Sequence, residues 1–387
     1  MKHTASLPEP DKDALAHSQK LIGKISDEIN RHSGISFRRY MEMALYEPGL
    51  GYYVAGTHKI GAQGDFITAP EISPLYSRCL ANQCAEVIHE TKGNILELGA
   101  GSGIMATDIL LELEKQQALP DHYFILDLSP DLKLRQKETL NNHAAHLLEK
   151  VEWLTQLPDD FSGIILGNEV LDAMPVDVFT RQNEQVFEHH VILEDGKLLE
   201  QLRPASDDLH KRVMALNIPH NATPYTSEIN PNLDGWFQSV SACLQKGVLL
   251  LLDYGYPHSE YYLAERNKGT LICHYQHLVN EAPLHYPGLQ DITASVDFTA
   301  AAESADSVDM SVAGFTSQAA FLNNTGLEEH FMQALETKPD DQYKLAQQVR
   351  TLSLPSEMGE RFKCIALTKH YDKPLQGFSS LDQRYRL

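Results

Sequence analysis

The chain has 387 residues, and its 53 Asp and Glu against 32 Lys and Arg give a formal net charge of −21. A hydrophobic content of 42% is that of an ordinary globular protein, which excludes extensive intrinsic disorder. An acidic protein is repelled by phosphate backbones unless it carries a basic patch, and the sequence shows none. The composition therefore disfavours a nucleic-acid partner and is compatible with a basic one.

The sequence shows no sign of membrane insertion or export. Its longest apolar run, residues 248–252, is far shorter than the ~20 residues of a membrane span. The first twenty residues lack the apolar segment of a signal peptide and carry Glu9, Asp11 and Asp13, unlike a mitochondrial leader. Five scattered cysteines indicate reduced thiols. We expect a cytoplasmic protein of bacterial type, with the mitochondrial matrix reserved for a eukaryotic relative.

The N-terminal part is expected to be helical, after a loose polar tail at residues 1–20. Residues 21–32 have helical apolar spacing, and residues 37–46 form a second short helix that Ser36 caps. The glycine-rich stretch that follows is irregular, and structured loops of this length are often functional. Residues 21–90 are therefore predicted to form a helical and loop lid.

Residues 91–387 alternate in α/β fashion. Near-continuous apolar strands indicate a parallel sheet that is buried on both faces. Insertions are expected at about 176–230, with a hairpin turn at Asp195-Gly196, and at 261–292. We expect an α/β, doubly wound, Rossmann-like fold with a mostly parallel sheet. Strands are predicted at 94–98, 123–128, 151–154, 163–167, 248–253 and 362–367, and helices at 104–116, 130–147, 298–305 and within 328–349.

A glycine loop directly follows the first of these strands, with Gly99, Gly101 and Gly103 at alternate positions. Glycines permit a tight turn and let a ligand approach the backbone without a Cβ clash. The spacing differs from the G-x-G-x-x-G of nicotinamide-binding proteins, which leaves that interpretation as a weaker alternative. A turn that serves only helix packing is the other alternative.

Acidic residues at two strand ends suit a nucleoside ligand with an amino-acid end. Asp127, next to Leu128, ends the second strand, where a carboxylate binds ribose hydroxyls. Glu97 precedes the loop and is expected to help place the charged amino-acid end of the ligand. The predicted ligand-binding residues in this part of the chain are Glu97, Gly99, Gly101, Gly103, Asp127 and Leu128.

A second polar segment follows the expected fourth strand and contains Asn168, Glu169 and Asp172. Ligands of open α/β sheets bind beyond the carboxyl ends of the strands, so we interpret these three residues as catalytic. Two carboxylates can hold a guanidinium in a fixed direction, and a carboxylate can accept a proton from an attacking nitrogen. The alternative is that Asp172 caps a following helix and Glu169 is merely solvated.

Further segments accompany these motifs in a fixed order, at residues 37–53, 64–73, 253–256, 291–298 and 358–363. Together they resemble the MidA-type methyltransferases, a family that includes the mitochondrial complex I assembly methyltransferase. The resemblance implies a class I methyltransferase fold, S-adenosyl-L-methionine as cofactor and S-adenosyl-L-homocysteine as product. In the mitochondrial branch it implies protein arginine methylation.

The resemblance also implies roles for residues in the lid. Thr68, Pro70 and Glu71 match a segment that borders the cofactor pocket in the family, and Asn168 and Glu169 match the segment facing substrate. A loop of glycine, proline and polar residues also suits closure over a pocket that excludes water, although a plain surface loop is the alternative.

The glycine loop departs from the family pattern at two positions. Ala100 and Ser102 stand where the family more often has Pro and Arg, and Asp127 stands where it often has Glu. Either carboxylate can bond ribose hydroxyls, and the lost Pro is expected to loosen the loop without abolishing binding.

We therefore expect a methyltransferase, with an arginine of a protein as the favoured acceptor. Three alternatives stay open: an assembly chaperone that uses the fold as a binding module, methylation of a small molecule, and methylation of nucleic acid. The last is disfavoured by charge and by the absence of the Asn-Pro-Pro-Tyr segment of DNA adenine methyltransferases. The insertions could shape either a substrate groove or a homodimer interface.

Other polar residues receive simpler interpretations. His274 and His277 form an H-x-x-H pair, but methyl transfer needs no metal, and we expect none. Asp291 and Asp297 are interpreted as helix caps. Residues 253–256 end the fifth strand, where they either form a turn or line a substrate cleft whose aromatic face could hold a cation.

Overall fold

The computed structural model describes residues 7–55, 67–219 and 222–387. Its central sheet consists of β2 (Asn94–Leu98), β3 (Tyr123–Leu126), β4 (Val151–Leu154), β5 (Phe161–Asn168), β10 (Leu244–Tyr256), β14 (Val296–Asp297), β15 (Ser311–Ser317) and β16 (Phe362–Lys369). The strand order is β15-β16-β10-β5-β2-β3-β4, with β14 pairing at the end of β10. The strands from β10 to β4 are parallel, whereas β16 runs antiparallel to both of its neighbours. The predicted, mostly parallel α/β sheet is confirmed.

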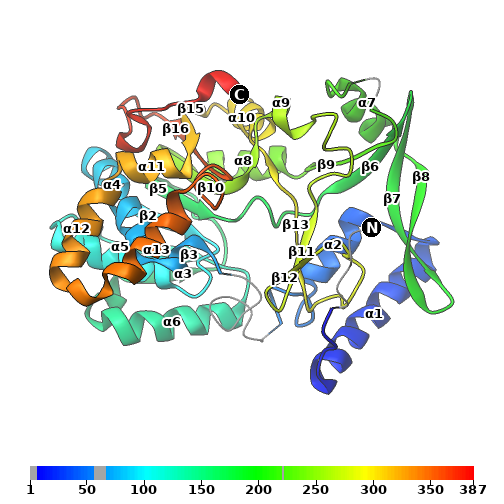
Figure 1. Cartoon of the computed structure of the whole chain (residues 1–387), viewed down its shortest axis with the longest axis horizontal. Helices are drawn as coiled ribbons and strands as arrows, with labels where there is room; N and C mark the ends of the chain where they lie inside the picture. Colours follow the sequence, from blue (N-terminus) through cyan, green and yellow to red (C-terminus); the bar gives the residue numbers. More distant parts are fainter. Residues whose placement is uncertain (1–6, 56–66, 220–221) are drawn as a thin grey trace.

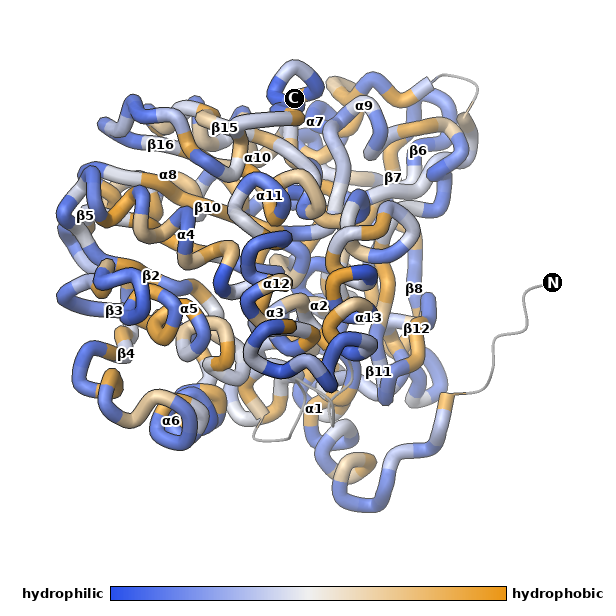
Figure 2. The backbone as a smooth tube through the Cα atoms, turned by 60° about the vertical axis from the view of Figure 1, so that its left-hand side comes forward, coloured by the Kyte–Doolittle hydropathy of each residue, from blue (hydrophilic) through white to orange (hydrophobic). Residues whose placement is uncertain are grey.

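Helices cover both faces of this sheet, which explains why its strands are apolar throughout. Along β10, Val248 and Leu250 pack into the core on one face, and Leu249 and Leu251 into the core on the other. Each buried side chain of this size contributes about 1.5–3 kcal/mol. Figure 2 shows hydrophobic segments in the interior and hydrophilic ones outside, for example along α6. The first face carries α4 (Pro74–Thr91), α5 (Ile104–Lys115), α6 (Pro130–Ala144), α11 (Gln318–Asn324), α12 (Leu327–Thr337) and α13 (Gln342–Ser353), and the second α8 (Leu233–Cys243) and α10 (Phe298–Asp306).

A second lobe lies beside the central sheet and contains the N-terminal helices and both insertions (Figure 1). Its larger sheet has the order β1-β7-β6-β9, with β8 paired to β7, and its smaller sheet has the order β12-β11-β13. Apolar residues of α1, such as Leu21 and Ile25, pack in one core with Val191 of β7 and Ile292 of β13. The elements are α1 (Lys12–His32), β1 (Ile35–Ser36), α2 (Phe37–Tyr46), β6 (Asp177–Gln182), β7 (Gln185–Glu194), β8 (Lys197–Pro204), α7 (Asp207–Ala215), β9 (Tyr225–Ile229), β11 (Ile272–Tyr275), β12 (Leu278–Asn280) and β13 (Asp291–Thr293).

Several short helices connect these elements. They are α3 (Ala69–Ile72), α9 (His258–Tyr261) and the 3₁₀ segments η1 (Ala145–Lys150), η2 (Pro339–Asp341), η3 (Gln376–Phe378) and η4 (Arg384–Arg386). Within residues 7–55, 67–219 and 222–387, no helix is both long and apolar enough to span a bilayer.

The predicted helix cap and hairpin turn are confirmed, because in both the residue type at the position determines the local backbone conformation. The Ser36 hydroxyl accepts from Arg39 N at 3.2 Å and caps α2, as predicted. The hairpin turn at Asp195-Gly196 is also confirmed, with φ of 49° and 75°. The loose tail predicted for residues 1–20 is wrong from residue 12 onward, because Asp11 accepts from Asp13 N and Ala14 N and starts α1.

Other element boundaries shift by a few residues. The second strand ends at Leu126, two residues before the predicted end. The helix predicted at 130–147 ends at Ala144 and continues as the 3₁₀ segment η1.

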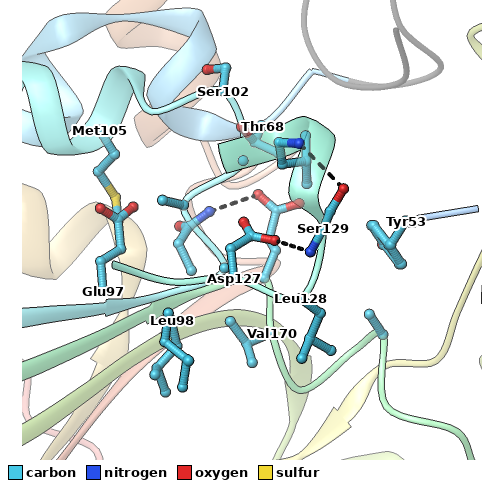
Figure 3. Close-up of a pocket in the computed structure, with 18 of the residues that line it drawn as sticks. Tyr53, Thr68, Glu97, Leu98, Ser102, Met105, Asp127, Leu128, Ser129 and Val170 are labelled. Carbon is cyan, nitrogen blue, oxygen red and sulfur yellow. Dashed lines mark hydrogen bonds between the residues drawn. The ribbon is translucent and has the colours of Figure 1, made fainter. Parts of the chain in front are cut away.

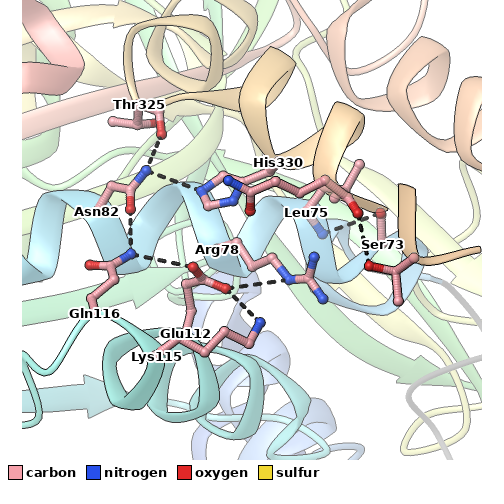
Figure 4. Close-up of polar contacts among 11 residues, drawn as sticks. Ser73, Leu75, Arg78, Asn82, Glu112, Lys115, Gln116, Thr325 and His330 are labelled. Carbon is pink, nitrogen blue, oxygen red and sulfur yellow. Dashed lines mark hydrogen bonds and ion pairs between the residues drawn. The ribbon is translucent and has the colours of Figure 1, made fainter. Parts of the chain in front are cut away.

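A polar network ties α4, α5 and α12 together on the outer side of the first helical face (Figure 4). The Asn82 amide bonds Thr325 O at 2.7 Å and His330 Nε2 at 3.0 Å, and Gln116 bonds Asn82 at 2.7 Å. Glu112 pairs with Lys115 at 3.0 Å. His330 is buried, and burial lowers its pKa. The network therefore holds a histidine, whose neutral form is favoured by burial, between helices that are far apart in sequence.

Candidate functional site

A cavity of about 450 Å³ lies at the carboxyl ends of β2, β3 and β5 (Figure 3). This is where ligands of open α/β sheets bind. Every predicted site residue except Gly103 lines it: Thr68, Pro70, Glu71, Glu97, Gly99, Gly101, Asp127, Leu128, Asn168, Glu169 and Asp172.

The glycine loop forms one wall of the cavity. Gly99 and Gly101 have φ of 68° and 52°, in the left-handed region that glycine adopts without strain. The Gly99 N–H donates to Leu126 O at 2.9 Å and ties the loop to the end of β3. Gly103 lies outside the cavity lining, and a Cβ there would lie 2.9 Å from Gln136 Cα. Close packing of α5 against α6 therefore accounts for the third glycine.

Asp127 is fixed at the end of β3. Its Oδ1 accepts from Ser129 N at 2.9 Å, and its Oδ2 accepts from Gln136 Nε2 at 2.7 Å. Burial raises the pKa of Asp127, and these hydrogen bonds oppose the rise. Each oxygen keeps acceptor capacity for a ligand hydroxyl. Leu128, 71% exposed, adds an apolar side chain to the cavity wall.

Glu97 lies near the end of β2 and is only 1% exposed. Its carboxylate accepts from the Tyr123 hydroxyl at 2.6 Å. Burial raises the pKa of Glu97 to about 7. The group is therefore a rigid polar residue whose charge responds to pH or to a bound cation.

The segment at the start of α3 closes against the glycine loop. The Ser102 hydroxyl donates to the Glu71 carboxylate, so the loop and the lid are joined directly. This contact uses the serine that replaces the arginine of the family pattern. The residues at 64–66 of the predicted closing loop lie outside the described part of the chain.

The predicted catalytic residues begin at the end of β5. Asn168 Oδ1 accepts from the Tyr76 hydroxyl at 2.5 Å, and its amide donates to Glu169 Oε1 at 3.2 Å. Glu169 has a φ of 53°, and a non-glycine residue in this region costs about 1–3 kcal/mol. Burial, together with the charge of Asp172, raises the pKa of Glu169 to about 8. Strain and a raised pKa in one cavity residue are typical of a functional site.

Asp172 does not cap a helix, because a turn and then β6 follow it. Its Oδ1 is buried and meets no donor at close hydrogen-bond distance among the described residues. Burial raises the pKa of Asp172 to about 6, although the Tyr254 hydroxyl and the Ala173 N–H oppose the rise. A buried carboxylate oxygen without a close donor costs free energy unless a ligand fills the position, so Asp172 is suited to a donor-rich ligand.

Asp253 belongs to the segment 253–256, which we interpreted as a turn or as the lining of a substrate cleft, and it holds the segment of the predicted catalytic residues in place. Its Oδ2 accepts from Leu171 N at 3.0 Å and Asp172 N at 3.2 Å. Asp253 lies near the end of β10, next to β5 in the sheet. The carboxylate therefore fixes the backbone on which Asp172 stands.

Two tyrosines from the N-terminal region complete the cavity and were not assigned from sequence. The rings of Tyr46 and Tyr53 stack at 5.6 Å, and the Tyr53 hydroxyl donates to Asp291 Oδ1 at 2.8 Å. Asp291 lies in β13 and lines the cavity, so its interpretation as a helix cap is wrong. Asp297 does cap α10, by accepting from Thr299 N and Ala300 N. The adjacent tyrosines Tyr52 and Tyr53 stand out in the sequence, but nothing in the sequence indicates that they lie opposite β13.

Comparison with known proteins shows the family. Residues 79–316 match a family model described as S-adenosyl-L-methionine-dependent methyltransferases. The chain belongs to this family. It is also similar to a Burkholderia thailandensis protein solved with bound S-adenosyl-homocysteine, at 38% identity and a TM-score of 0.94 over 99% of this chain and 100% of that one. A native crystal structure from the same organism gives a TM-score of 0.91 at 38% identity, with the same coverage.

Curated relatives extend the similarity to animals. The chain is 28% identical to the Drosophila melanogaster protein named protein arginine methyltransferase NDUFAF7 homolog, mitochondrial, over 96% of this chain and 91% of that one. It is 26% identical to human protein arginine methyltransferase NDUFAF7, mitochondrial, over 97% of this chain and 88% of that one. The resemblance inferred from the motifs is confirmed, and so is the class I methyltransferase fold.

The protein is thus a methyltransferase that uses S-adenosyl-L-methionine, and the cavity residues fit that cofactor. The fixed Asp127 carboxylate is suited to a ribose diol, and the two lining glycines leave the backbone open to a close ligand. Glu97 offers a counter-charge to an ammonium group. Leu128 and Met105 provide apolar surface for a ring.

Proposed function

We propose that this methyltransferase acts on an arginine side chain of a protein and methylates a guanidinium nitrogen. One observation carries the proposal: Glu169, Asp172 and Asp291 gather in the cavity beside two tyrosine rings, and no Lys, Arg or His of the described residues lines it. Such a site favours a cation. Carboxylates bind the planar guanidinium through paired hydrogen bonds, which fixes the direction of the nitrogen.

One group of cavity residues would bind the cofactor, and another would bind the acceptor. S-adenosyl-L-methionine supplies an electrophilic methyl group on a sulfonium. Asp127, Gly99 and Gly101 would hold its nucleoside part, and Glu97 its amino-acid end. Glu169 and Asp172 would bind the guanidinium and orient it, and orientation supplies much of the rate of a displacement reaction.

A guanidinium nitrogen must lose a proton when it is methylated. Because burial raises the pKa of Glu169 to about 8, its carboxylate accepts a proton more readily than an ordinary glutamate does. Tyr46 and Tyr53 cover the site with apolar ring faces, which exclude water and can contact a cation. The tyrosines and carboxylates therefore support the same acceptor.

Two further features support the proposal. The curated relatives are named protein arginine methyltransferases, at 26–28% identity to this chain. The five cysteines are all buried with free thiols, which suits the reducing cytoplasm in which we place the protein.

A matched pair of variants tests the acceptor site. Asp172→Asn should lower methyl transfer to protein arginine by at least tenfold while the affinity for S-adenosyl-L-homocysteine stays within about twofold, because Asp172 faces the acceptor. Asp127→Asn, its control on the cofactor side, should weaken that affinity. Unchanged transfer by Asp172→Asn would contradict the proposal.

A further inference from the structure

A second, larger cleft of about 760 Å³ lies between the end of β10 and the smaller sheet of the second lobe. It shares only Glu169, Asp172 and Asp291 with the cofactor cavity, among the residues that the structure describes. All three are carboxylates. The two hollows therefore meet at the acidic centre, so that a methyl donor and an acceptor can reach it from different sides.

One wall of this cleft is basic, although the protein has a net charge of −21. The Arg266 guanidinium lies 3.8 Å over the Tyr256 ring. The Arg361 carbonyl accepts from Gly255 N at 3.3 Å, which places Arg361 at the same end of β10. Lys268, on the loop after Arg266, also lines the cleft. Lys268 and Arg361 are exposed, and neither forms an ion pair within the described part of the chain.

Four acidic residues line the cleft besides the shared three, and none of them forms an ion pair with Arg266, Lys268 or Arg361 among the described residues. The buried Glu228 carboxylate accepts from Thr270 N at 3.1 Å and Leu271 N at 3.3 Å. Glu200 is held by His189 Nδ1 at 3.0 Å. Glu281 follows β12, in the same lobe as Arg266 and Lys268, and forms no ion pair with a described residue. Glu357 forms no ion pair with a described residue, including Arg361. The basic wall consists of Arg266, Lys268 and Arg361. Arg266 is held by the Tyr256 ring and by a hydrogen bond from its Nε to Glu260 O at 3.3 Å, whereas Lys268 and Arg361 are available to an occupant of the cleft.

We infer that this cleft binds the polypeptide segment around the acceptor arginine, and that its basic wall selects a segment with acidic side chains beside that arginine. The inference deepens the proposed function and rests on it. An arginine side chain can extend to the shared carboxylates while its backbone stays in the cleft. Neighbouring residues advance about 3.3–3.6 Å each along an extended chain, so acidic side chains within about three positions of the arginine reach the wall.

The test compares two peptides with one central arginine that differ only by Asp or Asn at the flanking positions. Initial rates are measured with wild-type enzyme, with the double variant K268E/R361E and with the control K246E/K373E. The control makes the same charge change at the opposite end of the sheet, where Gly247 pairs with Lys369. The affinity of each variant for S-adenosyl-L-homocysteine reports whether the cofactor site is intact.

Wild-type enzyme should have a KM about tenfold lower for the acidic peptide, since two exposed charge pairs each contribute a few-fold. The preference should shrink with added salt. K268E/R361E should lose or reverse it, and K246E/K373E should keep it, with cofactor affinity unchanged in both.

Equal KM values of the wild type for the two peptides would overturn the inference and leave the proposed function standing. An unchanged preference in K268E/R361E would do the same. Failure of the wild type to methylate any arginine, in peptides or in protein, would overturn both.

Discussion

Replacing Glu169 by Gln should remove the pH dependence of methyl transfer that we assign to the ionisation of this carboxyl. Burial and the charge of Asp172 raise the pKa of Glu169 to about 8, from an ordinary value of 4.5. In the free enzyme at pH 7 only about one molecule in ten then carries the carboxylate, since one pH unit is a tenfold change. If the carboxylate binds the guanidinium and accepts its proton, the rate rises with pH until the group is ionised.

The assay is the pH profile of kcat/KM for a protein or peptide acceptor between pH 5.5 and 9.5. The wild type should show an acid limb with a slope of about one, at or below pH 8, because the positive sulfonium of the bound cofactor favours the ionised glutamate. Glu169→Gln should have a much lower rate and no such limb. Glu71→Gln, which changes another carboxylate of the cavity on the lid side, should retain it. The reasoning is refuted if the limb persists in Glu169→Gln or if the wild-type profile is flat.

Three further changes should have distinct effects. Gly103→Ala should destabilise the fold by about 1–3 kcal/mol in urea unfolding, because φ is +83° and the new Cβ would meet Gln136; unchanged stability would contradict the packing role. Asp127→Asn should weaken S-adenosyl-L-homocysteine binding about 10- to 100-fold in calorimetry, since a hydrogen bond to a charged group is worth about 1.5–3 kcal/mol; an unaltered Kd would refute the ribose assignment. Burial lowers the pKa of His330, so its contribution to stability is complete above pH 6.5 and is lost as pH falls through the folded-state pKa. His330→Asn should reduce the fall in the free energy of unfolding below pH 6.5. An identical slope in the variant would contradict the contribution assigned to His330.

The central sheet could be predicted because burial on both faces requires apolar residues along each strand, and such a run is visible in the sequence. A strand such as β10, buried on both faces, must be apolar throughout, and Val248 to Leu252 show this directly in sequence. The hairpin at Asp195-Gly196 and the cap at Ser36 depend only on residues that are close in sequence. The start of α1 was missed because its first turns expose polar residues, and only the cap at Asp11 marks them.

The cavity lining was predictable where a strand end carries a polar side chain of its own, as at Asp127 and Glu169. The remaining parts depend on contacts between distant segments. The Tyr53 hydroxyl meets Asp291, 238 residues away in sequence, and Asp253 bonds the backbone of Asp172 across neighbouring strands. The spacing of these residues in sequence carries no signal for such pairs, because the first arises from packing within the second lobe and the second from the pairing of β5 with β10.

The most direct test is to identify the residue that receives the methyl group. A lysate of cells lacking the protein is incubated with the purified enzyme and S-adenosyl-L-methionine labelled in its methyl group, and labelled protein is hydrolysed to amino acids. The account predicts a labelled protein whose label is recovered as methylarginine, and at least tenfold less label with Asp172→Asn. Label in another amino acid or only in small molecules, from an enzyme that binds S-adenosyl-L-homocysteine, would contradict it.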